Sequence, residues 1–430
     1  MPAQERPSRA RYVVIGLCVL VAIITYADRI AISQAQPLLT KELGLTPQQM
    51  SWTYFAFFFA YALFEIPGGW MADRWGARKS LTRVVIMWSI FTALTGWAFG
   101  FWSLLFIRLF FGMGEAGAFP SVTRAFSDWL PAGERARAQG ILWLSARWGG
   151  AFTPLLVAGM MTVVSWRTVF EIFGGVGILW AIVFFRWYRD RPEHHPAVNK
   201  AELKLLEGRT TGSTHGPIPW GPLLRSRSVK LLWAQYMSIN FTWPFYITWL
   251  PTYLQEARGL PPGKGALLSG LPLFFGGFGC LLAGLMGKRL ASRYEIGFAR
   301  RVMPMIGCTC AAIFLLIFPA IPNPYLAMVV LGLASFSNDL LMPSAWATCM
   351  DIGGKHAGVV SGSMNMMGNL FAALSAPTVG YILSVTNKNY NILFYIGAGF
   401  YLLGTLSWAY IDPKERLEGA PARATAPVPA

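Results

Sequence analysis

Six ionisable residues lie inside strongly apolar stretches of the 430-residue sequence. They are three arginines and three acids: Asp28, Arg29, Arg108, Glu115, Arg147 and Asp339. A charge near the bilayer centre costs roughly 2.5–3.5 kcal/mol on insertion scales, so each of them requires a partner or a function. Guanidinium groups present forked donors that match a carboxylate, and carboxylates beside them can exchange protons. The set is typical of proton-coupled binding of an organic anion; the alternative is that ion pairs only fix helix positions.

Spacing places two of these residues on one helix. Arg108 and Glu115 are seven residues apart, which is about two turns, so they share a helix face. Gly112 between them leaves room for a neighbouring backbone or side chain. Asp28 and Arg29 are adjacent in the first apolar stretch. Both neighbourhoods therefore combine a base with an acid that can hold a proton.

A polar stripe runs along one apolar segment near the C-terminus. Ser361, Asn365 and Asn369 follow i, i+4, i+8 spacing, so they lie on one face of a helix. Two interpretations stay open, which are hydrogen bonding between helices and contact with hydroxyl groups of a substrate. Polar and aromatic residues elsewhere are weaker lining candidates, because aromatics in membrane helices more often pack or lie at the interface: Asn240, Trp243, Tyr246, Ser344 and Trp346.

The elements that carry these residues are membrane helices. Hydrophobic residues make up 54% of the chain, charged residues 13%, and the mean hydropathy is +0.45, which excludes an ordinary soluble protein. A span needs about 20 apolar residues. The sequence predicts an all-α integral membrane protein with twelve spans, at 12–35, 49–72, 80–100, 102–123, 138–163, 168–188, 229–252, 264–287, 299–319, 324–348, 357–385 and 391–411.

Basic residues orient the predicted spans. The net charge is +16, and 28 of the 36 basic residues lie in the loops on the side of the termini, against 5 in the opposite loops. Both termini are therefore expected in the cytoplasm, and the charge requires no nucleic-acid partner. The first span is too long for a signal-peptide core and is expected to stay attached. Five cysteines and four histidines lack the spacing of a metal or catalytic centre, so no cofactor, metal or catalytic residue is expected.

The chain divides into two sets of six spans. We expect a first six-helix half at 1–188, a cytoplasmic linker at 189–228, a second half at 229–412 and a cytoplasmic tail at 413–430. The short loop at 69–79 has an echo at 284–301, which indicates an internal repeat of the kind found in secondary transporters. The acid and the bases of the loop at 69–79 can pair with each other and with helix dipoles. We therefore predict a gate formed by Gly69, Asp73, Arg74, Gly76 and Arg78. Glu65 is assigned to the same gate.

The loop at 69–79 resembles the signature of the major facilitator superfamily. More narrowly, the chain resembles the anion:cation symporter family of galactonate, glucarate and hexuronate permeases, vesicular glutamate transporters and sialin. The segments that carry this resemblance are YADR at 26–29, YALFEIPGG at 61–69, RLFFGMGEAGAFP at 108–120, FTWPFYITWLPTY at 241–253 and SMNMMGN at 363–369. It implies the two-half major facilitator fold.

The resemblance also implies roles for five residues. Arg29 matches the arginine that clamps the substrate carboxylate, and Tyr61 matches a binding-site tyrosine. Asp28 and Glu115 match acids that exchange protons, and Arg108 matches the arginine that tunes the second acid.

Arg147 departs from the family pattern, because sugar-acid members commonly carry glutamine in the segment SARWGG at 145–150. A fixed cation there favours a second anionic group on the substrate, as in a dicarboxylate or sulfonate-carboxylate, or it pairs with Asp339. Asp339 is then either a structural partner or an additional proton site.

The expected function is transport rather than catalysis. We expect a monomeric, multi-pass protein of the bacterial inner membrane that imports a small organic anion with protons by alternating access. An exchanger or proton-driven exporter of the same fold is the alternative, and a membrane-embedded enzyme is more remote. The sequence leaves open the substrate, its charge, the proton stoichiometry, and whether Arg147 and Asp339 contact substrate.

Overall fold

The structure is a computed structural model that describes residues 6–206, 217–245, 250, 253–254, 257–260, 268, 270–386 and 389–417. All regular elements within these ranges are helices. In the same ranges, nine helical segments are long and apolar enough to cross a membrane, which confirms the prediction of a multi-pass helical protein. Two of the nine, Trp52–Thr95 and Pro324–Ser375, are each long enough to hold two of the predicted spans.

The first helix group contains α1–α6. Their bounds are α1 Ala10–Leu43, α2 Pro47–Thr95, α3 Phe101–Glu115, α4 Ala118–Trp129, α5 Ala132–Met161 and α6 Trp166–Trp187. The predicted separation of spans 49–72 and 80–100 becomes a bend within α2 at Gly76, whose φ of +82° suits glycine. The predicted span 102–123 is interrupted, because Ala116 and Gly117 leave the helical conformation between α3 and α4.

The second helix group follows the linker helices. The linker forms η1 Pro192–His194, α7 Lys200–Leu205 and α8 Trp220–Arg225. The second group contains α9 Arg227–Pro244, α12 Leu271–Arg293, α13 Ile296–Ile317, η3 Phe318–Ala320, α14 Pro324–Asp339, α15 Met342–Gly353, η4 Gly354–His356, α16 Ala357–Val385 and α17 Asn391–Tyr410. The predicted span 324–348 is interrupted between α14 and α15, at the place that corresponds to the α3–α4 break.

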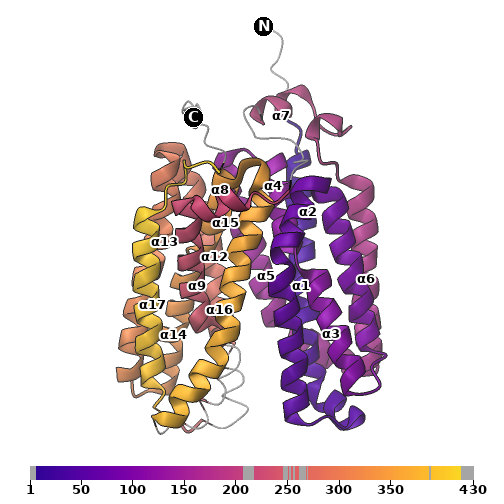
Figure 1. Ribbon diagram of the computed structural model, residues 1–430, viewed down its shortest axis with the longest axis vertical. Helices are drawn as coiled ribbons and strands as arrows, with labels where there is room; N and C mark the ends of the chain where they lie inside the picture. Colours follow the sequence, from indigo (N-terminus) through magenta and orange to yellow (C-terminus); the bar gives the residue numbers. More distant parts are fainter. Residues whose placement is uncertain are drawn as a thin grey trace.

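The two groups stand side by side, and the linker helices α7 and α8 lie at one end of the molecule, called here the linker end (Figure 1). Two helix pairs, α2 with α16 and α5 with α12, form the seam between the groups. Glycines bring these helices into backbone contact. A β-carbon on Gly140 of α5 would lie 2.7 Å from the Cα of Gly284 of α12, and one on Gly69 would collide with the carbonyl of Gly358. The close approach explains small residues on both sides of the seam.

Candidate substrate and proton site

Arg29 and Glu115 form the central ion pair of the first helix group. The Nε of Arg29 on α1 lies 2.6 Å from Oε1 of Glu115, which is the last residue of α3. The Glu115 side chain is 1% exposed, whereas that of Arg29 is 20% exposed. The Arg29 guanidinium lies over the ring of Tyr61, 4.5 Å from its centroid. One edge of the Arg29 guanidinium therefore contacts a buried acid, while part of the Arg29 side chain stays accessible.

Asp28 and Arg108 are buried beside this pair. Asp28 accepts a weak hydrogen bond from Thr92 at 3.4 Å. Arg108 stacks on Phe111, with its Cζ 4.2 Å from the ring centroid, and has no ion pair within the described part of the chain. The following atoms are buried and have no hydrogen-bond partner among the described residues: Asp28 Oδ1, Arg29 Nη2, Arg108 Nε and Glu115 Oε2. Such atoms are rare in folded proteins, and each requires an explanation, of which a functional role is one.

Arg147 and Asp339 form a second ion pair, which crosses the seam. Nε and Nη2 of Arg147 on α5 lie 2.8 and 2.9 Å from the two carboxylate oxygens of Asp339, the last residue of α14. Trp243 of α9 lies against the guanidinium, with its ring centroid 3.8 Å from Cζ. Of the two sequence interpretations of Arg147, the structure shows the pairing with Asp339. The bidentate geometry makes this a strong tie between the two groups.

Asp339 is held by a chain of hydrogen bonds that the sequence did not indicate. Asn338 donates to Oδ1 of Asp339 at 2.7 Å. Tyr401 of α17 donates to Asn338 at 3.0 Å and accepts from Thr242 of α9, also at 3.0 Å. The tyrosine hydroxyl therefore orients the Asn338 amide, which in turn orients the carboxylate. Tyr401 looked like one more aromatic in an apolar helix, so only the fold reveals its role.

Asn365 is the member of the polar stripe that bonds to another helix. Its amide donates to Glu65 at 2.6 Å and to the hydroxyl of Tyr61 at 3.1 Å, both on α2. Ser361 and Asn369 instead donate to backbone carbonyls of their own helix. The predicted stripe therefore acts at Asn365 as a bond across the seam.

The weaker lining candidates lie in packed surroundings. Trp346 is fully buried among aromatic rings, 5.4 Å from Trp143 between centroids, and Ser344 beside it is also buried. Asn240 donates to the carbonyl of Tyr236 on its own helix. Tyr246 lies outside the described residues.

Asp73 ties the predicted gate to the second helix group. Its carboxylate accepts from the backbone amides of Gly358 and Val359, at 2.9 and 2.8 Å, at the start of α16. It also faces Arg124 of α4, with 3.7 Å between Nη1 and Oδ1. A carboxylate at a helix N-terminus is stabilised by the helix dipole. The dipole contact was expected, whereas the expected pairing with bases of the same loop is not found among the described contacts of Asp73.

The bases of that loop face the first helix group instead. Arg78 donates to the carbonyl of Phe185 at 2.6 and 2.9 Å and through its amide to Asp190 at 2.8 Å. Arg74 lies over the ring of Trp70. Asp190 fills the space beside Gly76, where burial raises the pKa of its carboxyl, partly offset by the hydrogen bond from the Arg78 amide, which lowers it. These contacts stabilise the bend in α2.

A second carboxylate cluster at the linker end was missed in the sequence. Asp351 of α15 accepts from Arg135 of α5 at 2.9 Å and from Arg300 of α13 at 2.8 Å. Arg300 also donates to the carbonyl of Ala132. Because these residues are far apart in the chain, no local sequence motif indicates that they form a cluster. Together with Asp73, the cluster joins the two helix groups at the linker end.

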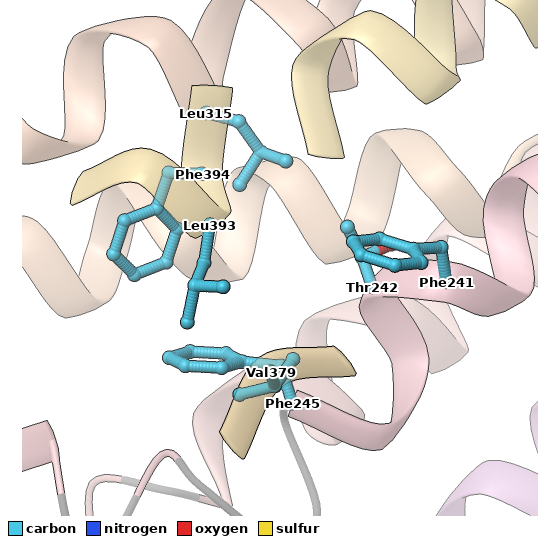
Figure 2. Close-up of a pocket in the computed structure, with 7 residues that line it drawn as sticks. All are labelled: Phe241, Thr242, Phe245, Leu315, Val379, Leu393 and Phe394. Carbon is cyan, nitrogen blue, oxygen red and sulfur yellow. The ribbon is translucent and has the colours of Figure 1, made fainter. Parts of the chain in front are cut away.

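A small pocket lies in the second helix group. Figure 2 shows its lining, which is apolar apart from one threonine: Phe241, Thr242, Phe245, Leu315, Val379, Leu393 and Phe394. Without a basic side chain it offers nothing to an anion. Within the described ranges, no group of three metal-ligating side chains is found.

A polytopic helical protein with two buried arginine–acid pairs, one of which crosses the seam, is typical of a membrane transporter. The family model of the Major Facilitator Superfamily matches residues 18–376, so this chain belongs to that superfamily. Its relatives place it with the anion:cation symporters. The expected all-helical major facilitator fold and the expectation of a transporter rather than an enzyme are thereby confirmed.

Two curated relatives extend over nearly the whole chain. The probable sulfoacetate transporter of Cupriavidus necator is 33% identical over 411 residues, covering 94% of each chain. The probable galactarate/D-glucarate transporter of Escherichia coli is 29% identical over 442 residues, covering 97% of each. A solved structure of an MFS proton:xylose symporter matches with a TM-score of 0.72 at 14% identity, covering 95% of this chain and 98% of that one. This last likeness shows the fold alone.

Proposed function

We propose that this protein imports a small organic anion together with protons by alternating access. The observation that carries the proposal is the contact between Arg29 and Glu115, a partly accessible cation held by a buried acid. We assign twelve spans, with residues 1–188 and 229–412 as the two halves, 189–228 as a cytoplasmic linker and 413–430 as a cytoplasmic tail. We propose that the protein is a monomer in a bacterial inner membrane, with both termini in the cytoplasm.

Exchange of partners at Arg29 supplies the coupling. An ionised Glu115 competes with the substrate carboxylate for the guanidinium. Protonation of Glu115 removes that competition, so Arg29 can clamp the incoming anion. Asp28 and Arg108 lie beside the pair, where Asp28 offers a second protonatable group and Arg108 an additional positive charge. The affinity for the anion then differs between the protonated and the deprotonated protein, which is the condition for coupling anion transport to proton transport.

The same exchange operates at Arg147. Protonation of Asp339 frees a second guanidinium, which can take a second anionic group of the substrate. The relatives support this, because sulfoacetate carries a carboxylate and a sulfonate, and glucarate carries two carboxylates. We therefore propose a small dianion as substrate, with Tyr61, Asn240, Ser344, Trp346, Asn365 and Asn369 as the candidates for contacts with its uncharged part.

The linker end serves as the cytoplasmic gate. The contact of Asp73 on α2 with the start of α16 holds this gate closed, and so do the ion pairs of Asp351 with Arg135 and Arg300. Substrate therefore enters from the opposite side of the membrane. Opening toward the cytoplasm breaks these contacts. The bend of α2 at Gly76 and its close approach to α16 at Gly69 give α2 the shape that the Asp73 contact needs. Arg78 stabilises the bend, and Arg74 lies beside it.

Proteoliposomes test the proposal. Purified protein is reconstituted, and uptake of labelled sulfoacetate and D-glucarate is measured with and without an acidic outside. Acid outside should accelerate uptake and drive accumulation. Anion exchange at a rate that does not depend on the pH gradient would indicate an exchanger of the same fold and would refute proton symport.

A further inference from the structure

Glu65 is a buried acid at the seam that the mechanism above does not use. It lies on α2, one turn from Tyr61 and two turns before Asp73, and it is 0% exposed. Its Oε1 accepts from the Asn365 amide of α16 at 2.6 Å. Its Oε2 is buried and has no hydrogen-bond partner among the described residues. Glu65 therefore stands between the Arg29 site and the gate, with neutral side chains as its contacts.

The helices around Glu65 offer it little compensating charge. Its own helix contributes Tyr61, and α16 contributes Asn365. The charged groups that act on it from neighbouring helices are Arg29 of α1 and Glu115 of α3, which already pair with each other. No cation lies within ion-pairing distance of Glu65 in the described part of the chain. An ionised carboxylate in such a place is expensive, so a proton on Glu65 is favoured while the seam is closed.

Asn365 suits a carboxyl group that changes its protonation state. An amide NH₂ can donate either to an ionised carboxylate or to the carbonyl oxygen of a protonated carboxyl, and Tyr61 can donate or accept to match. The seam at this height is tight, because a β-carbon on Gly362 of α16 would lie 2.5 Å from the Glu65 carbonyl oxygen. Separation of α2 from α16 would therefore remove Asn365 and admit water to the carboxyl.

We propose that Glu65 is a further proton-binding residue of the transport cycle, protonated while α2 and α16 are in contact and deprotonated toward the cytoplasm when they separate. This inference rests on the proposed proton symport and adds one proton to its stoichiometry. Asn365 is the positioning residue that holds the Glu65 carboxyl while the seam is closed. The proton of Glu65 is thereby linked to the gate rather than to the binding of the anion.

Infrared spectroscopy tests the protonation state without any substrate. Wild-type protein at neutral pH should show a carbonyl band of a protonated carboxylic acid that is absent in Glu65→Gln and retained in Glu115→Gln. Asn365→Leu should shift this band, because the carboxyl loses its amide partner. Identical carboxylic-acid bands in wild type and Glu65→Gln would overturn the inference.

Accumulation tests the stoichiometry. In proteoliposomes with D-glucarate or sulfoacetate, Glu65→Gln should retain counterflow but accumulate about tenfold less anion per unit of pH gradient, since one pH unit drives one proton by about 1.4 kcal/mol. Equal accumulation by the variant and wild type overturns the role of Glu65 alone. Failure of wild type to respond to the gradient overturns the proposed symport instead, and the infrared result does not depend on it.

Discussion

Glu115 and Asp339 hold corresponding positions in the two helix groups. Each is the last residue of the helix that precedes a break, α3 before α4 and α14 before α15, and each accepts an arginine from another helix. Repeated transporter folds place their binding sites where interrupted helices of the two repeats meet. In the proposed function, two releasable guanidinium groups at such a place select the anion, and the acids that hold them make its binding depend on protons.

The first prediction concerns the clamp. Arg29→Ala should abolish both uptake and thermal stabilisation by D-glucarate or sulfoacetate, because the guanidinium that holds the carboxylate is gone. Arg29→Lys should bind weakly, since a single ammonium cannot form two parallel hydrogen bonds. Arg186→Ala, an exposed arginine at the end of α6, is the control and should behave like wild type. Stabilisation of Arg29→Ala by the same anions would disprove the clamp.

The second prediction separates binding from proton coupling. Glu115→Gln cannot ionise, so it should bind anion and catalyse counterflow but lose accumulation driven by a pH gradient. The matched control is Glu171→Gln, which removes a peripheral carboxylate that bonds to Trp97. Unchanged gradient-driven accumulation in Glu115→Gln would refute the coupling role.

The third prediction concerns the tie between Arg147 and Asp339. Asp339→Asn leaves a buried cation without its partner, which typically costs about 3–5 kcal/mol. The double variant Arg147→Gln, Asp339→Asn removes both charges and should recover most of the lost thermal stability. Thermal unfolding of the purified variants measures this. Equal losses in the single and double variants would show that the pair does not contribute as a unit.

The fourth prediction concerns the support of Asp339. Tyr401→Phe removes the hydroxyl that orients Asn338, and a hydrogen bond contributes about 0.5–1.5 kcal/mol net. Thermal stability should fall in the wild-type background and fall less in the Asp339→Asn background, because the two residues act through one chain. Tyr395→Phe, at an exposed tyrosine on the same helix, is the control. An equal fall in both backgrounds would separate Tyr401 from Asp339.

The fifth prediction concerns the gate. Asp73→Asn weakens the contact with the start of α16, so the linker end should open more often. Cys349 is buried on α15, which packs against α5 of the first helix group, so its thiol should label faster when the groups separate, as located by mass spectrometry. Asp412→Asn, at an exposed carboxylate that contacts Arg301 of α13 and the amide of Lys414, should leave labelling unchanged. The gate assignment fails if Asp73→Asn labels no faster than wild type.

The sequence was sufficient for the class of fold and for the charged residues. Charges in apolar stretches are costly, so residue type and position alone single out Arg29, Glu115, Arg147 and Asp339. The partners of Arg147 could not be decided, because α5 and α14 come from different halves and only their packing brings the pair together. The breaks after Glu115 and Asp339 were also missed, since apolar composition continues across them.

The contacts at the linker end show a second limit. Asp73 was expected in the gate, but its partner is the backbone of α16, which no side-chain pattern can reveal. Arg135 and Arg300 were counted among the basic loop residues that set orientation, and their clustering with Asp351 depends on three helices meeting. Sequence patterns thus predict which residues need partners, while the fold determines which partners they find.

The central claim is that protonation of Glu115 releases Arg29 for the anion. The most direct measurement is calorimetric titration of wild type and Glu115→Gln with D-glucarate and sulfoacetate across a range of pH, in buffers that differ in ionisation enthalpy. The account predicts that wild type binds more tightly as pH falls and takes up protons on binding. Glu115→Gln should bind tightly with much less dependence on pH and less proton uptake. The same pH dependence and proton uptake in both proteins would contradict it.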